Sequence, residues 1–178
     1  DILNSKITTD KNVYTVQNVL MKSHVVVHGT GGIGNYVSLS LIASGIGKIT
    51  LIDNDIIELS NLNRQILFTE DDIGKPKIEI AKKRLSDLNS TAQINTIHSF
   101  ASNETEIEHL YNQIGEFDFV ILSADSNWSL KNWIDNYRFK VNFNYGIIPC
   151  GYNGDIGLVG PLVDNSSKRF VVSKTFQM

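Results

Sequence analysis

Cysteine and proline are scarce in this sequence of 178 residues, which contains one cysteine, Cys150, and three prolines. A single cysteine excludes an internal disulfide and a cysteine-rich metal site, and it favours a reducing, cytoplasmic environment. No apolar run approaches the roughly 18 residues that a membrane span requires. The formal net charge of −3 lacks the basic excess of proteins that bind nucleic acids or membrane surfaces. We therefore expect neither kind of partner.

Short apolar runs alternate with helical patterns along most of the chain. The expected strands lie at 25–27, 48–53, 94–97, 117–122, 141–145 and 155–159, and the expected helices at 10–22, 32–44, 76–88, 105–114 and 127–139. Apolar, β-branched runs are typical of parallel strands that are buried on both faces. Their alternation with helices predicts a Rossmann-like, doubly wound α/β fold, with a mostly parallel sheet and helices on both faces.

A glycine-rich loop lies between the first of these strands and the next helix. Gly29, Gly31, Gly32 and Gly34 belong to a G-x-G-x-x-G pattern, and Asp53 ends the following strand. Glycines let the backbone approach a phosphate or ribose closely, and the helix N-terminus favours negative charge. An acid at the end of the second strand can hold ribose hydroxyls. This part of the sequence predicts a nucleotide site but leaves NAD and ATP both open.

The irregular segment after Asp53 contains groups that suit a polyphosphate. Asp55 begins it, Asn61, Arg64 and Gln65 lie in its centre, and Lys77 stands at the start of the next helix. Arginine binds phosphate oxygens through a planar fork, and lysine binds them as a point charge. Hydride transfer would not need these cations, so the segment favours ATP over a nicotinamide cofactor.

Asp125 follows the strand expected at 117–122 and would lie at the ligand-binding edge of the sheet. A carboxylate there can hold Mg²⁺ beside the phosphates. The four histidines, His24, His28, His98 and His109, form no spaced cluster, so we predict no metal role for them.

Together these motifs resemble the signature of the ThiF/MoeB/E1 superfamily of adenylyltransferases. The glycine loop, Leu51-Ile52-Asp53-Asn54-Asp55, Asn61-Leu62-Asn63-Arg64-Gln65 and Gly74-Lys75-Pro76-Lys77 occur in the order typical of that family. Ser123-Ala124-Asp125 and Gly160-Pro161-Leu162 are similar to the peptide-modifying branch typified by the microcin C7 enzyme MccB. The resemblance runs from about Val13 to Leu162. It divides the chain into a helical lead-in at 1–22, an adenylation domain at 23–165 and an unpatterned tail at 166–178.

The resemblance implies an ATP- and Mg²⁺-dependent enzyme that adenylates the C-terminal carboxylate of a peptide or small protein and acts as a homodimer. The glycine loop, Asp53, Asp55, Asn61 and Gln65 would bind ATP. Arg64, Lys77 and Asp125 would be catalytic, with Asp125 also holding Mg²⁺. Two alternatives stay open: an NAD-dependent oxidoreductase or nucleotide-dependent dehydratase of related fold, and a non-catalytic, peptide-binding half of a larger synthetase.

The chain also departs from the family in two respects. No arginine precedes Arg64, although family members use one from an N-terminal segment, and the two Cys-x-x-Cys pairs that bind zinc in many members are absent. We therefore expect no zinc site within this chain. Either the sequence is a piece of a longer protein or the site works without these residues.

Overall fold

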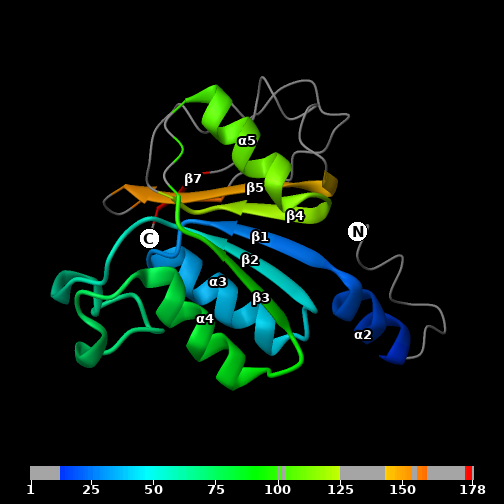
Figure 1. Ribbon diagram of the computed structural model, residues 1–178, viewed down its shortest axis with the longest axis horizontal. Coiled ribbons are helices and arrows are strands. Elements are labelled where there is room, and N and C mark those ends of the chain that lie inside the picture. Colours follow the sequence, from blue (N-terminus) through cyan, green and yellow to red (C-terminus); the bar gives the residue numbers. More distant parts are fainter. Residues whose placement is uncertain are drawn as a thin grey trace.

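The computed structural model describes residues 13–99, 101, 103–124, 143–153, 156–159 and 175–177. Its strands form one seven-stranded sheet in the order β3-β2-β1-β4-β5-β6-β7 (Figure 1). The first five strands of that order are mutually parallel, and β6 and β7 are antiparallel to their neighbours. The strands are β1 (His24–His28), β2 (Lys48–Ile52), β3 (Gln93–Ile97), β4 (Phe117–Leu122), β5 (Phe143–Asn153), β6 (Ile156–Val159) and β7 (Thr175–Gln177).

Helices cover both faces of this sheet, as the sequence predicted. In Figure 1, α3 (Gly32–Ala43) and α4 (Lys77–Leu88) lie on one face and α5 (Glu104–Ile114) lies on the other. Because side chains alternate along a strand, Val25 and Val27 pack into the cluster that contains α3 and α4 residues, whereas Val26 packs into the cluster of α5. The wholly apolar run of β1 is therefore explained by burial on both sides.

The switch in direction of the chain lies between β1 and β4. From β1 the chain adds β2 and β3 on one side, then crosses to add β4 and β5 on the other. Ligands of such sheets bind at the carboxyl ends of the strands beside this switch, where the connecting loops separate. The predicted Rossmann-like fold is confirmed, and it directs attention to the segments that follow His28, Ile52 and Leu122.

The segment between β2 and α4 has little regular structure, apart from the 3-10 turns η1 (Leu59–Asn61) and η2 (Glu70–Asp72). In η2 the carboxylate of Asp72 accepts hydrogen bonds from the Thr69 N–H and hydroxyl, at 3.0 and 2.9 Å, and pairs with Arg84 of α4 at 3.1 Å. Burial alone would raise the pKa of Asp72, but these donors outweigh it and lower the pKa to about 2. Asp72 thereby fastens the segment to α4.

Several boundaries differ from those predicted. Pro76 precedes α4 as its N-cap, and the helix begins one residue later, at Lys77. Gly45 follows α3 with a φ of 92°, the left-handed conformation expected of a glycine after a helix. The tail without clear pattern contains β7, which pairs with β6. Three residues are too few to show an alternation, so this strand depends on its neighbour for its definition.

The lead-in is represented by α2 (Val13–Lys22). None of the described helices is long and apolar enough to cross a membrane. Asp125, the helix predicted at 127–139 and the Gly160-Pro161-Leu162 motif lie outside the described residues.

Candidate functional site

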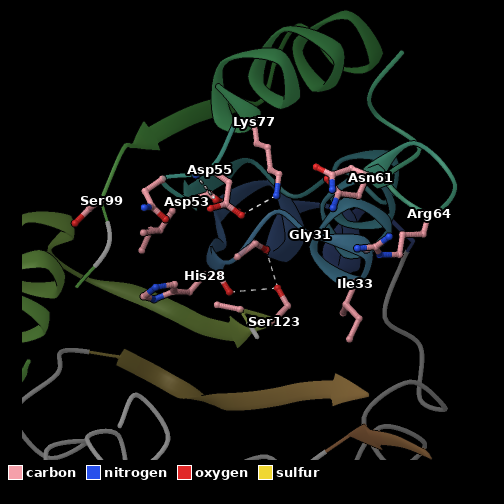
Figure 2. A pocket seen from close by; sticks show the side chains of 16 residues that line it. His28, Gly31, Ile33, Asp53, Asp55, Asn61, Arg64, Lys77, Ser99 and Ser123 are labelled. Carbon is pink, nitrogen blue, oxygen red and sulfur yellow. Dashed lines mark hydrogen bonds and ion pairs between the residues drawn. The ribbon is translucent and has the colours of Figure 1, made fainter. Parts of the chain in front are cut away.

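A cavity of about 460 Å³ opens at the carboxyl ends of β1, β2 and β4. Its walls come from the glycine loop, from the segment between β2 and α4, and from residues that follow β3 and β4. Figure 2 shows the labelled side chains of Asp53, Asp55, Asn61, Arg64 and Lys77 around this space. The structure thus brings together side chains that are up to 24 positions apart in the sequence (77 − 53).

The four predicted glycines have different roles in this geometry. Gly29, Gly31 and Gly32 line the cavity, but Gly34 does not. A side chain on Gly34 would collide with the carbonyl oxygen of Gly29, so Gly34 permits close packing of α3 against the loop. Gly29 has a φ of 99°, and a side chain there would meet the backbone of Ala124. Gly34 therefore faces the loop backbone and is not among the residues that line the cavity, and its part in nucleotide binding stays a prediction.

Asp53 is held at the end of β2 by backbone and side-chain donors. Its Oδ2 accepts hydrogen bonds from the Thr30 N–H at 2.6 Å and the Thr30 hydroxyl at 2.8 Å, and its Oδ1 accepts one from the Asp55 N–H at 2.9 Å. These bonds orient the carboxylate at the glycine loop. Both lone-pair sites of Oδ2 are thereby used, whereas Oδ1 can accept a further hydrogen bond, so a ribose hydroxyl can still be bound there.

Lys77 reaches the cavity from the first residue of α4. Its side chain is only 7% exposed, and its Nζ lies 2.8 Å from Oδ2 of Asp55 (Figure 2). The Lys77 N–H also donates to the Asp55 carbonyl at 3.0 Å. A buried cation needs a paired anion, and an ammonium has three donors. Asp55 therefore stabilises the buried ammonium and leaves donors for a phosphate oxygen.

Arg64 is exposed and lies across the glycine loop. Its Nη1 donates to the carbonyl oxygen of Ser60 at 3.0 Å and to Oδ1 of Asn63 at 2.9 Å. A side chain on Gly32 would come within 3.3 Å of Cγ of Arg64. Gly32 therefore leaves room for the arginine to reach the entrance of the cavity.

Asn61 and Gln65 are buried beside Arg64, at 7% and 2% exposure. Oδ1 of Asn61 accepts a hydrogen bond from the Glu58 N–H at 3.1 Å, which closes the η1 turn. Oε1 of Gln65 has no hydrogen-bond partner among the described residues. A buried acceptor without a partner is costly, and a ligand group that donates a hydrogen bond in the cavity would satisfy it.

Sequence reasoning assigned no site role to His28, Ser99 or Ser123, although all three line this cavity. The Ser123 hydroxyl donates to the carbonyl oxygen of Gly29 at 2.7 Å and so supports the loop from β4. His28 is one of the four histidines that form no cluster in the sequence. Its position between three valines and the glycine loop was nevertheless a signal that it lies at the site. The Mg²⁺ role of Asp125 stays a prediction, and the described residues contain no group of three or more His, Cys, Asp or Glu that could hold a metal.

Comparison with known proteins gives this site its context. The family model described as the ThiF family matches residues 3–166. The chain belongs to the ThiF family. The expected resemblance to this superfamily is thus confirmed, and it covers most of the chain.

Proteins with different named activities are similar to this chain. The probable molybdopterin-synthase adenylyltransferase of Porphyra purpurea is 40% identical over 110 residues, which cover 62% of this chain and 28% of that protein. The tRNA threonylcarbamoyladenosine dehydratase of Bacillus subtilis is 33% identical over 109 residues, covering 60% of this chain and 41% of that protein.

A solved structure extends the similarity over more of the chain. The crystal structure of E. coli MccB with AMPCPP and SeMet MccA has a TM-score of 0.79 and 42% identity, and the match covers 86% of this chain and 44% of that chain. The predicted similarity to MccB is therefore confirmed. This chain spans less than half the length of each of these three proteins.

Proposed function

We propose that this chain provides the ATP site of an adenylyltransferase that activates the C-terminal carboxylate of a peptide or small protein. The observation that carries the proposal is the cavity, which is lined by Asp53, by the glycine loop and by the cations Arg64 and Lys77. The similarity to MccB, solved with AMPCPP and MccA, supports both the nucleotide and the peptide.

The nucleotide would lie with its ribose at Asp53 and its phosphates toward Arg64 and Lys77. The backbone of Gly31 and Gly32, at the N-terminus of α3, offers N–H groups and a partial positive charge for the phosphates. Asn61 and Gln65 would complete this polar wall. Asp53 is close enough to the glycine loop to bond with Thr30, so the ribose and phosphate sites adjoin.

The reaction would be attack of the acceptor carboxylate on the α-phosphorus of ATP, with pyrophosphate as the leaving group and an acyl-adenylate as product. Arg64 and Lys77 would neutralise the negative charge that develops on the phosphate oxygens. Bound Mg²⁺ would add to this neutralisation, with Asp125 as its proposed protein ligand; Mg²⁺ typically needs only one or two carboxylates beside substrate phosphates. No protein nucleophile is required for this step.

We further propose that the acceptor is a peptide of a natural-product pathway, that the enzyme is a homodimer and that it acts in the cytoplasm. The support for the peptide is the similarity to MccB, whose structure includes MccA. The reducing environment favoured by a single cysteine supports the compartment.

Two other functions make different predictions. An NAD-dependent oxidoreductase would bind NADH tightly and ATP weakly, but the cations Arg64 and Lys77 at the cavity favour a polyphosphate. A nucleotide-dependent dehydratase is the stronger competitor, because the Bacillus subtilis dehydratase is 33% identical to this chain over 109 residues.

The test is exchange of labelled pyrophosphate into ATP by the full-length protein, with and without candidate peptides. The wild type should exchange, and Arg64→Ala and Asp125→Ala should each abolish exchange while keeping the native melting temperature. Asp87→Ala removes an exposed carboxylate from the far part of α4 and should exchange normally. Absence of exchange with every carboxylate acceptor, or normal exchange by Arg64→Ala, would refute the proposal.

A further inference from the structure

His28 is the last residue of β1 and has a position that strand packing alone does not explain. It lies on the same side of the strand as Val26, facing α5, and is only 7% exposed. The three preceding positions are valines, and a fourth apolar residue would fill this place without the cost of burying an imidazole. His28 also lines the cavity. Its burial and its place at the cavity wall therefore indicate that His28 contacts a ligand.

Tyr111 of α5 holds the imidazole in place. Nδ1 of His28 lies 3.1 Å from the Tyr111 hydroxyl oxygen, and the two rings are tilted by 37° with centroids 6.1 Å apart. Tyr111 is itself 3% exposed and packs against Phe117, with ring centroids 5.9 Å apart. The tyrosine is therefore anchored in the hydrophobic core, and the histidine ring is fixed through it.

The hydrogen-bonding state of the imidazole follows from its surroundings. Burial lowers the pKa of His28 to about 4, although the nearby Asp53 carboxylate acts in the opposite direction. The ring is therefore neutral at physiological pH, with one nitrogen as donor and the other as acceptor. Nδ1 is engaged with Tyr111, and Nε2 has no hydrogen bond to the described residues. Nε2 is thus the nitrogen that remains for a ligand.

The cavity has two chemically different regions. Arg64 and Asn61 lie on one side in Figure 2, whereas His28 and Ser99 lie on the other, with Asp53 near them. The His28 side carries no cation, because its imidazole is neutral. Phosphates belong at the cations, so the region that holds His28, Ser99 and the Asp53 carboxylate is left for the nucleoside.

We propose that His28 contacts the nucleoside of the bound nucleotide through Nε2, and that Tyr111 is a positioning residue for that contact. This inference rests on the proposed nucleotide site, and it makes recognition depend on the nucleoside as well as on the phosphates. His28→Leu removes the proposed hydrogen bond to the nucleoside and introduces an apolar side chain of similar size. Tyr111→Phe keeps the ring in the core and removes only the hydroxyl.

The experiment is calorimetric titration of the full-length protein with ATP and, separately, with inorganic tripolyphosphate. His28→Leu should weaken ATP binding roughly 2- to 10-fold, the worth of one neutral hydrogen bond, and leave tripolyphosphate binding unchanged. Tyr111→Phe should show the same selectivity with a smaller loss. His28→Gln, which keeps a polar group near the position of Nε2, should retain part of the affinity. The matched controls His109→Leu and Tyr36→Phe, both at exposed positions, should bind both ligands as the wild type does.

Two results would overturn this assignment. One is unchanged ATP affinity in His28→Leu, and the other is equal weakening of ATP and tripolyphosphate, which would indicate a general effect on the cavity. If His28→Leu does not fold, the contrast between ATP and tripolyphosphate in Tyr111→Phe decides. If the wild-type protein binds ATP but does not exchange pyrophosphate, adenylation is refuted, and the effect of His28→Leu on ATP and tripolyphosphate binding can still be measured. If the wild-type protein binds no nucleotide, both the proposed function and the role of His28 are overturned.

Discussion

Replacing Gly34 with alanine sets two effects of opposite sign against each other. Gly34 is the third residue of α3, and alanine in a helix is favoured over glycine by about 1 kcal/mol. However, the new methyl group would collide with the carbonyl oxygen of Gly29. That carbonyl oxygen also accepts the hydrogen bond of Ser123, so it cannot move without cost.

The size of the net effect follows from these two contributions. Overpacking a rigid site costs about 1–3 kcal/mol, and backbone is less yielding than a side chain. We therefore take the upper part of that range, about 2–3 kcal/mol. Subtracting the gain of about 1 kcal/mol in helix propensity, we expect Gly34→Ala to destabilise the fold by about 1–2 kcal/mol. In a chain of this size that lowers the melting temperature by roughly 2–8 °C. ATP affinity should fall as well, because displacement of Gly29 distorts the loop that lines the cavity.

The assay is thermal unfolding of the nucleotide-free protein, followed by circular dichroism. Ser40→Ala is the control for stability, because it also places an alanine in α3 but at an exposed position, where no backbone collision arises. It should melt within about 2 °C of the wild type, as changes of less than 0.5 kcal/mol do. A Gly34→Ala protein that melts at or above the wild-type temperature would show that the loop yields easily. An equal loss in Ser40→Ala would show that the effect is not the collision.

Other substitutions test the remaining parts of the site. Lys77→Ala should lower pyrophosphate exchange at least 10-fold because it removes a charge-assisted contact to phosphate, whereas Lys82→Ala, on the exposed side of the same helix, should leave exchange unchanged. Asp53→Asn should weaken ATP binding measured by calorimetry, since an amide cannot accept all the hydrogen bonds from Thr30 and the ribose; wild-type affinity would contradict the ribose assignment. The lowered pKa of Asp72 contributes stability above pH 4 that is lost as the pH falls from about 4 to about 2. It amounts to about 2 kcal/mol, so Asp72→Asn should be less stable than the wild type at pH 7 and close to it at pH 2 in urea unfolding.

Local patterns were sufficient for much of the fold. Val25, Val26 and Val27 indicated a strand buried on both faces, and the structure places them alternately against α3 and α4 and against α5. Phe117–Leu122 was predicted with the bounds that it has. Such strands can be recognised from the sequence alone, because burial on both faces requires apolar residues at every position. The strand Thr175–Gln177 had no such signal, since an antiparallel edge strand depends on pairing with its neighbour β6.

The candidate site divides in the same way. The sequence by itself determined that a glycine loop, an acid at Asp53 and the cations Arg64 and Lys77 occur in the order typical of the ThiF family, because motifs are read along the chain. Only the tertiary structure decided that Gly34 packs against Gly29 instead of lining the cavity, and that Lys77 is buried against Asp55. The sequence also contained no indication that His28 lies beside Tyr111, which is 83 positions away. Burial and hydrogen bonding depend on what distant segments bring to a residue, and that information exists only in the folded chain.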